Sequence, residues 1–228
     1  TITGRKTDGS MKSVVVGPAS EWKQFVSRAD QVEPEDETIF SIYGVTLDGK
    51  EIFISDAVGS NHDLSSISVL DYPYLKVAFN TKDKVNLTPS QWKNWAVLYE
   101  PVAEGILVFK GPESFLTVEE GQAWNSTFGF TNMTSKNFKA SLRVDLEIVN
   151  KQTQNREQQN FTIVAPAPGD TTFFDITSST LGKIGKNDVN VFVNKRILAE
   201  TYYDNNFIAL PDYLTVLADK TPPILDVT

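Results

Sequence analysis

The sequence of 228 residues contains no cysteine and a single histidine, His62. The absence of cysteine excludes disulfide frameworks, thiolate zinc sites and cysteine nucleophiles from this chain. The sequence also lacks a hydrophobic run of the ~18 residues that a membrane-spanning helix requires, so we expect no membrane span. Basic residues are in the minority, because 21 Lys and Arg stand against 29 Asp and Glu and give a formal net charge of −8. This balance disfavours nucleic acid as a partner.

Short motifs of enzyme chemistry are missing as well. No Gly-x-Ser-x-Gly nucleophile elbow occurs, and the segment Gly182–Lys186 has neither the spacing nor the Ser/Thr of a phosphate-binding loop. Amphipathic helical patterning never extends beyond about two turns. We therefore expect a protein built from strands, with no cofactor, no metal and no catalytic residue of its own.

Alternation of apolar and polar side chains is the strongest pattern that the sequence contains. From Phe138 to Ile148 every second residue is apolar, and the residues between them are charged or polar. A period of two with one apolar face is typical of a strand in an antiparallel sandwich. Trp124, Phe128 and Phe130 give a similar apolar face before this run. Further strands are predicted at Ser13–Val16, Trp22–Val26, Thr38–Thr46, Glu51–Ile54, Tyr74–Asn80, Trp95–Glu100, Thr171–Thr177, Val189–Asn194 and Tyr213–Leu217.

Turn signals between these runs predict two domains. Asp48-Gly49 favours a hairpin turn, and Thr88–Gln91 has the composition of a helix start, with Thr as the cap and Pro in the first turn. The segment Pro101–Gly105 predicts a domain junction. We predict an all-β fold of two tandem antiparallel β-sandwiches: a jelly-roll-like domain over residues 10–104 and an immunoglobulin-like domain over residues 105–218. Residues 219–228 are predicted to start a linker to a further module.

Several segments resemble a known family. Those of the first half are Val14–Trp22 (VVVGPASEW), Ile42–Gly49 (IYGVTLDG), Asp63–Ile67 (DLSSI), Asp71–Phe79 (DYPYLKVAF) and Asn86–Gly105 (NLTPSQWKNWAVLYEPVAEG). They are similar to the region that follows the catalytic domain in gingipain-like cysteine peptidases of Bacteroidota, which are described as sortases of the type IX secretion system. In the second half, Tyr202–Val216 followed by Asp219–Thr228 resembles a CARDB-type, immunoglobulin-like module that leads into another domain.

The resemblance implies an accessory role. Peptidases of this family use a Cys nucleophile and a His base, and no position of this chain matches that motif, so the catalytic domain is expected to precede Thr1. The chain is then expected to be a non-catalytic piece of a larger secreted or cell-surface bacterial protein, which spaces and orients the catalytic domain or docks substrate. Its expected partners are the flanking domains of the same polypeptide, together with protein or glycan at the cell envelope.

Aromatic side chains in the first half predict an alternative function. Sandwich modules bind glycans on exposed Trp or Tyr faces, and the candidate ligand-binding residues here are Trp92, Tyr72 and Tyr74. The alternative prediction is a carbohydrate-binding module of a surface polysaccharide-acting protein, and the competing interpretation is that these rings pack in the core. A glycosidase with two carboxylates is a third hypothesis, because such a pair needs no local spacing.

Two polar segments contain residue types found in catalytic or metal sites, but we interpret both as structural. His62 beside Asp63 has the composition of a general base, yet without a nucleophile motif the segment Ser60–Asp63 is predicted to be a polar turn. The acidic run Glu33–Glu37, with Asp30 before it, offers oxygen ligands for Ca²⁺. Because no D-x-D-x-D-G loop accompanies it, a solvated loop is predicted instead.

One residue is a candidate for modification. Asp170-Thr171-Thr172 resembles the short O-glycosylation motif of Bacteroidota and follows a Pro/Gly loop, where access is expected to be good. Thr171 is the predicted acceptor.

Overall fold

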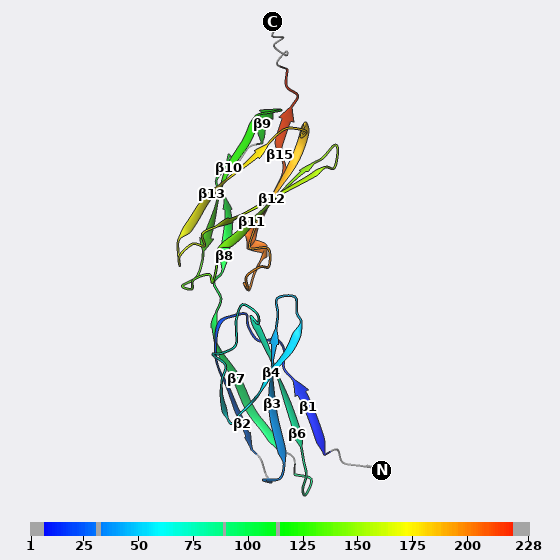
Figure 1. The fold of residues 1–228 in the computed structure, drawn as a ribbon, viewed down its shortest axis with the longest axis vertical. Coiled ribbons are helices and arrows are strands. Elements are labelled where there is room, and N and C mark those ends of the chain that lie inside the picture. The colour runs from blue at the N-terminus through cyan, green and yellow to red at the C-terminus, as the bar shows by residue number, and fades with distance from the viewer. Residues whose placement is uncertain (1–6, 31–32, 89, 113–114, 221–228) are drawn as a thin grey trace, which may run out of the picture. The chain divides into compact units, whose positions relative to one another are not determined.

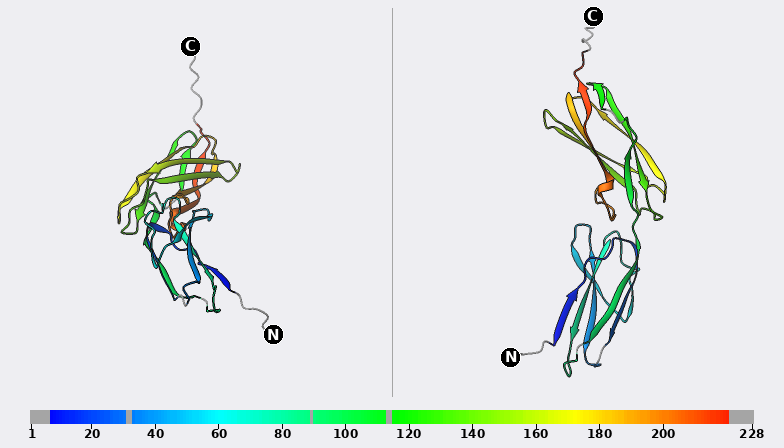
Figure 2. Two further views of the ribbon diagram at one scale, coloured as in Figure 1. Left: turned by 60° about the horizontal axis from the view of Figure 1, so that its bottom comes forward. Right: turned by 180° about the vertical axis from the view of Figure 1, so that it is seen from behind.

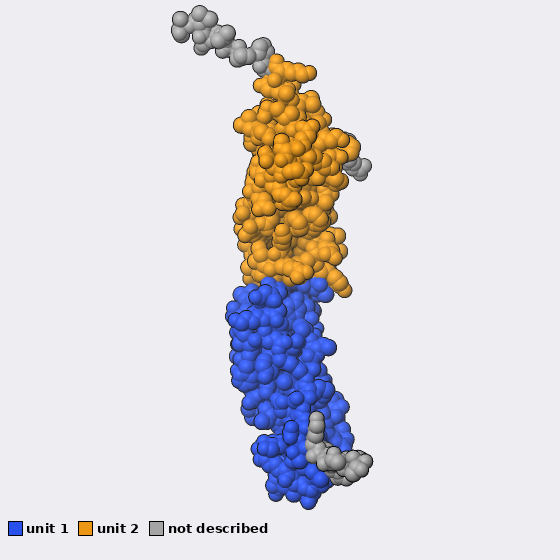
Figure 3. Space-filling view, turned by 90° about the vertical axis from the view of Figure 1, so that its right-hand side faces the viewer, with its two compact units in different colours: residues 1–102, 199–201 blue, residues 103–198, 202–228 orange. Residues whose placement is uncertain are grey.

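The computed structural model describes residues 7–30, 33–88, 90–112 and 115–220, and nearly all of its regular structure is β-strand (Figure 1). Within these residues one 3₁₀ turn, η1 (Asp204–Asn206), accompanies fifteen strands, and no helix has the length and hydrophobicity needed to cross a membrane. The chain divides into two compact units, residues 1–102 with 199–201 and residues 103–198 with 202–228 (Figure 3). These observations confirm the predicted fold class of two tandem antiparallel sandwiches.

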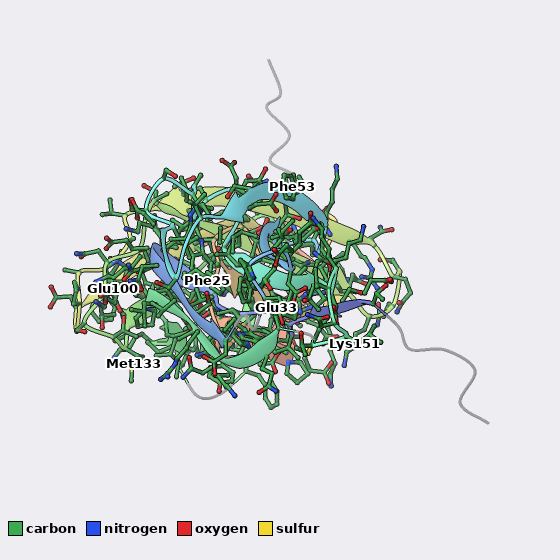
Figure 4. All side chains as sticks on the ribbon, turned by 90° about the horizontal axis from the view of Figure 1, so that it is seen from below. Phe25, Glu33, Phe53, Glu100, Met133 and Lys151 are labelled. Carbon is green, nitrogen blue, oxygen red and sulfur yellow. The ribbon has the colours of Figure 1, made fainter. Side chains whose placement is uncertain are left out.

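The first unit consists of two antiparallel sheets with the strand orders β1-β6-β3-β4 and β5-β2-β7. Its strands are β1 (Asp8–Lys12), β2 (Ala19–Asp30), β3 (Glu37–Val45), β4 (Glu51–Ala57), β5 (Asn61–Asp63), β6 (Tyr74–Lys82) and β7 (Gln91–Pro101). Both sheets contribute aromatic side chains to one core, in which Phe25 of β2 lies 5.2 Å from Phe40 of β3 between ring centroids. In Figure 4, Phe25 lies among the side chains of this unit, whereas Phe53 of β4 lies at its periphery.

The second unit also consists of two sheets, with the strand orders β13-β10-β8 and β12-β11-β14-β15-β9. Its strands are β8 (Gly105–Phe109), β9 (Leu116–Glu119), β10 (Ala123–Asn132), β11 (Leu142–Asn150), β12 (Arg156–Ile163), β13 (Thr171–Ser179), β14 (Gly185–Val193) and β15 (Phe207–Leu217). Every described pairing is antiparallel except that of β9 with β15. The core lies between the two sheets, because buried side chains of β10 and β13 belong to the same cluster as those of β11 and β14.

The alternation that predicted β11 corresponds to burial. Leu142, Val144, Leu146 and Ile148 are buried in the core of the second unit, while Arg143 on the opposite face is exposed. The strand begins at Leu142 and not at Phe138, because the chain before Leu142 forms bends; the Phe138 ring instead packs against the core from outside the strand.

The structure corrects several local predictions in the first half. No helix starts at Thr88–Gln91: Thr88 and Ser90 have no regular structure, Gln91 begins β7, and Pro89 lies outside the described residues. The first strand of the described residues is Asp8–Lys12, drawn in blue in Figure 2, and of the predicted strand Ser13–Val16 only Val16 makes a bridge, to Leu75.

Three strands of the second unit were not predicted from the sequence, namely β8, β9 and β12. The division between the units falls after Val102, while the sequence prediction puts the junction at residues 104–105. Residues 221–228 of the predicted linker lie outside the described part of the chain.

Candidate functional site

Trp92, the first candidate ligand-binding residue, is half-buried at the start of β7. Its ring stacks on Phe79 and on Trp95, with centroid distances of 5.0 and 5.8 Å, and meets Phe40 edge-on at 5.3 Å (centroid to centroid). Its indole N–H donates to the Asn94 carbonyl oxygen over 3.0 Å. The ring therefore closes one end of the core of the first unit, in line with the packing interpretation.

Tyr72 and Tyr74 lie at the other end of that unit. Tyr74 is the first residue of β6 and pairs with Val45, whereas Phe79, on which Trp92 stacks, is five residues further along the same strand. At ~3.3 Å per residue, that separation is roughly 16 Å along the strand. The three candidates thus do not converge on one platform.

Tyr72 has a structural environment of its own. Its carbonyl oxygen accepts a hydrogen bond from the buried Trp22 indole N–H over 2.9 Å, and its ring covers the backbone of Gly44. A Cβ atom at Gly44 would approach the Tyr72 ring to 2.5 Å, so glycine is required there for the ring to lie flat on β3.

Thr171, the candidate O-glycosylation acceptor, is the first residue of β13 and is half-buried. Its hydroxyl is 2.7 Å from the hydroxyl of Thr131, which lies opposite it on β10. The preceding turn is closed by a hydrogen bond of 2.9 Å from the Asp170 N–H to the Ala167 carbonyl oxygen.

The described hydrogen bonds of the His62 and Asp63 side chains are to other residues, among them Ser55, whose Oγ atom is 3.5 Å from His62 Nε2, and the segment is not the predicted turn. Asn61–Asp63 form the short strand β5, which pairs with β2. The Nδ1 atom of His62 accepts from the Val58 N–H over 3.2 Å, while Asp63 accepts two hydrogen bonds of 2.9 Å from the backbone and hydroxyl of Ser65. These bonds from Ser65 hold the pKa of the Asp63 carboxyl group below its usual value. The same two bonds fix the turn that follows β5.

The acidic segment 33–37 is only partly the solvated loop that was predicted. Glu35 is exposed, but Asp36 is buried, and its Oδ1 atom accepts a hydrogen bond of 2.9 Å from the Lys84 N–H. In the part of the chain that the structure describes, no three His, Cys, Asp or Glu side chains gather as a metal-binding group.

The second unit contains a cavity of about 430 Å³ beside the segment that follows β14. Phe192 and Phe207 stack at its wall with their centroids 4.2 Å apart. Lys195 Nζ lies 4.5 Å from the ring centroid of Phe192, and the Arg196 guanidinium lies 5.4 Å from the ring centroid of Tyr203, a further aromatic residue that lines the cavity. Among the described ion pairs neither cation has a carboxylate partner, so the cavity combines aromatic walls with two cations, while Asp204 is the one acidic residue of its lining.

Sequence reasoning missed this cavity because its residues are consecutive only in part. Asn194 and Arg196 adopt left-handed backbone conformations, with φ of 54° and 53°, and this folds Lys195 and Arg196 back over the aromatic rings. The Asn194 side chain supports that turn, because its Oδ1 atom accepts from the Leu198 N–H over 2.7 Å. The sequence feature that could have indicated this turn is the Asn-Lys-Arg run after a strand, because Asn tolerates the left-handed backbone region.

The described fold defines a class, that of non-helical proteins built from tandem β-sandwiches. No protein-family model and no curated protein matches the chain. Among solved structures, the chain is similar to a CARDB domain from Pyrococcus furiosus that was crystallised in complex with di-metal ions; the identity is 16%, the TM-score is 0.40, and the match covers 51% of this chain and 90% of that one.

A second similarity is to a β-glucuronidase of Bacteroides uniformis. Here the identity is 10%, the TM-score is 0.27, and the match covers 86% of this chain but 25% of the enzyme. Similarities as weak as these two do not bear on the activity or ligands of this chain. The resemblance to gingipain-like peptidases stays a prediction.

Proposed function

We propose that this chain is a non-catalytic accessory segment of a large secreted or cell-surface bacterial protein, a gingipain-like peptidase, in which it spaces and orients the catalytic domain. The observation that supports this role is the bracing of the loops of the second unit by buried asparagine side chains. Five asparagines of this unit are almost fully buried. One is Asn206 of η1, and the other four, which donate to backbone carbonyl groups of loops, are Asn132, Asn150, Asn187 and Asn194.

Each of these side chains holds a loop through backbone hydrogen bonds. Asn150 illustrates the arrangement: its Oδ1 atom accepts from the N–H groups of Gln152 and Thr153 over 3.0 and 2.9 Å, and its Nδ2 atom donates to the Ile184 carbonyl oxygen over 2.9 Å. Asn132 likewise accepts from the Thr134 N–H over 3.0 Å. Buried, fully bonded polar groups of this kind favour one loop conformation over others. A rigid body with fixed loops suits a spacer, because it transmits orientation from one end to the other.

Deleting the segment from its parent protein tests this role. We expect the catalytic domain to keep its turnover of a small fluorogenic peptide but to lose activity on a folded protein substrate, because only the latter depends on orientation. Replacement by a Gly/Ser linker of equal residue number is the control for length. Equal activity of the deleted and intact proteins on both substrates would contradict the proposal, as would hydrolytic turnover by the isolated chain.

The cavity beside Phe192 supports a docking role within the same function. Lys195 beside the stacked rings of Phe192 and Phe207, and Arg196 beside the ring of Tyr203, suit a partner segment that carries carboxylates and apolar side chains. The double variant Lys195→Glu/Arg196→Glu is expected to weaken retention of the chain on isolated cell envelopes at least about tenfold. Lys139→Glu, a charge reversal at another exposed lysine, serves as the matched control. Unchanged retention of the double variant would remove this cavity from the proposal.

A polysaccharide pull-down separates this function from the carbohydrate-binding alternative. Because the Trp92 ring already stacks on Phe79 and Trp95, we expect no saturable binding to insoluble polysaccharide. Saturable binding that is lost in Trp92→Ala would establish the alternative instead.

A further inference from the structure

One end of the first unit contains a set of buried oxygen atoms, which we call the oxygen cluster. Its members are the side chains of Asp36, Thr38, Thr81, Asp83 and Ser90. They come from three places in the chain: the start of β3 with the residue before it, the end of β6 with the residue after it, and the residue before β7.

Strand register brings the first four together. Phe40 pairs with Phe79 and Thr38 with Thr81, so that the two threonines follow the two core phenylalanines on the inner face. The paired register ends at Glu37 and Lys82, and its continuation by one residue puts Asp36 opposite Asp83. Their proximity is supported by the hydrogen bond of 2.9 Å that Asp36 accepts from the N–H of Lys84, the residue after Asp83.

Ser90 approaches from the facing sheet. Trp92, two residues further on, packs against Phe40 and Phe79. Because residues two apart in an extended chain share a face, Ser90 lies on the same side as Trp92, one step closer to the end of the sandwich. The cluster therefore lies between the two sheets, at the end of the core that Trp92 closes.

The oxygens of the cluster are buried and in large part unsatisfied. Asp83 is 6% exposed and Ser90 is 8% exposed. Asp83 Oδ1, Ser90 Oγ, Thr38 Oγ1 and Thr81 Oγ1 are inaccessible to solvent and have no hydrogen-bond partner among the described residues. Asp83 also takes part in no described ion pair. A buried carboxylate without a compensating cation is strongly disfavoured, and two carboxylates across one register step repel each other.

We propose that the oxygen cluster binds a divalent cation, and that this cation is Ca²⁺. All of its side-chain donors are hard oxygens, which exclude the thiolate and imidazole preferences of zinc and copper. Two carboxylates together with hydroxyls suit the large and irregular coordination shell of Ca²⁺ better than the strict octahedron of Mg²⁺. The bound ion would neutralise the facing carboxylates and connect the ends of β3, β6 and β7, so that both sheets of the first unit are held together at this end.

A calcium titration of the full chain after chelator treatment tests the proposal. Unfolding of the first unit is followed by tryptophan fluorescence, since Trp22, Trp92 and Trp95 belong to this unit. We expect Ca²⁺ at about millimolar concentration, the range of extracellular calcium modules, to raise the Tm of that transition by at least about 5 °C. The transition of the second unit should not move.

Substitution of Asp83 gives a signature that a purely structural role would not produce. Asp83→Asn removes one of two repelling carboxylates, so it should raise the Tm of the calcium-free protein and at the same time abolish the response to Ca²⁺. Glu35→Gln, in the exposed part of the same acidic loop, is the matched control and should keep the full response.

Two outcomes would overturn the proposal. One is a calcium response that survives in Asp83→Asn, and the other is a wild-type protein whose Tm is insensitive to Ca²⁺. If Asp83→Asn does not fold, binding of Tb³⁺ to the wild-type protein decides whether the oxygen cluster binds a cation. Emission sensitised by Trp92 and displaced by Ca²⁺ supports the site, and its absence contradicts it.

Discussion

At the scale of single residues, the second unit contains a lysine whose charge is neutralised locally. Lys183 is nearly buried; its ammonium donates to the Ser179 carbonyl oxygen and lies 2.6 Å from Glu157 Oε2. Burial by itself would raise the pKa of Glu157, but the hydrogen bonds from Lys183, Gln159 and Ser178 outweigh this effect and lower the pKa. The pair thus connects the edge strand β12 to the turn after β13.

The lowered pKa of Glu157 predicts a pH-dependent contribution to stability. Because its folded-state pKa lies below the ordinary value of 4.5, the contribution is present above about pH 4.5 and lost as the pH falls through the folded-state pKa. Lys183→Met should therefore destabilise the second unit by about 1–2 kcal/mol at neutral pH and by less near pH 3. Urea unfolding of the wild-type and variant proteins at the two pH values measures the difference.

Lys186→Met provides the control for this prediction. The Lys186 side chain is 63% exposed, and its Nζ atom lies 3.8 Å from Asp212 Oδ2. Removing an exposed partner of this kind should change the free energy of unfolding by no more than about 0.5 kcal/mol. If Lys183→Met destabilises the second unit equally at both pH values, Lys183 does not stabilise the unit through its ion pair with Glu157.

At the scale of elements, β11 offers a direct test of which face is buried. Leu142 is 1% exposed, whereas Ser141 beside it is exposed. Leu142→Asp puts an unpaired charge into the core of the second unit and should cost more than about 4 kcal/mol, enough to remove its unfolding transition. Ser141→Asp should leave that transition within about 0.5 kcal/mol. Circular dichroism during heating distinguishes the two variants, and an unchanged melting curve for Leu142→Asp would refute the assignment.

The sequence predicts best those strands that have one apolar and one polar face. β11 is the clearest case, because Leu142 and Ile148 lie in its core-facing row. β12 was missed because its sequence, REQQNFTI, supplies apolar side chains only at Phe161 and Ile163. As an edge strand of its sheet it is stabilised by pairing with β11 along one side, which single-sequence periodicity does not register. β5 was missed for the same reason, because Asn61–Asp63 is polar throughout and its strand conformation depends on pairing with β2.

Candidate sites are less predictable than strands, because they depend on register. The acidic run 33–37 looks uniformly solvated in sequence, yet Asp36 is separated from Phe40 by an even number of residues, as the inner-face Thr38 is, and is buried. Asp83 lies 47 positions away and becomes its neighbour only when β3 pairs with β6, and no spacing rule reveals such a partner. By contrast, the packing of Trp92 was among the interpretations of the sequence because large aromatic side chains are commonly buried, although its neighbours Gln91 and Lys93 are polar.

At the scale of the whole molecule, the two units have separate cores. The cluster around Phe25, Phe40 and Phe79 and the cluster around Phe128, Phe130 and Phe174 have no residue in common. Each unit contains both of the sheets that cover its core. Since burial of apolar area provides most of the driving force for folding, each unit contains the main source of its own stability.

Separate cores predict two independent unfolding transitions. Phe25→Ala, which removes a fully buried ring from the first unit, should cost about 3–5 kcal/mol and lower the Tm of one transition by at least roughly 10 °C, without moving the other. Phe128→Ala is the matched variant, because Phe128 is equally buried in the second unit, and it should lower the other transition. Differential scanning calorimetry of the full chain resolves both. If either substitution shifts both transitions together, the two units do not unfold independently. The chain would then be one cooperative folding unit and not two separately stable ones.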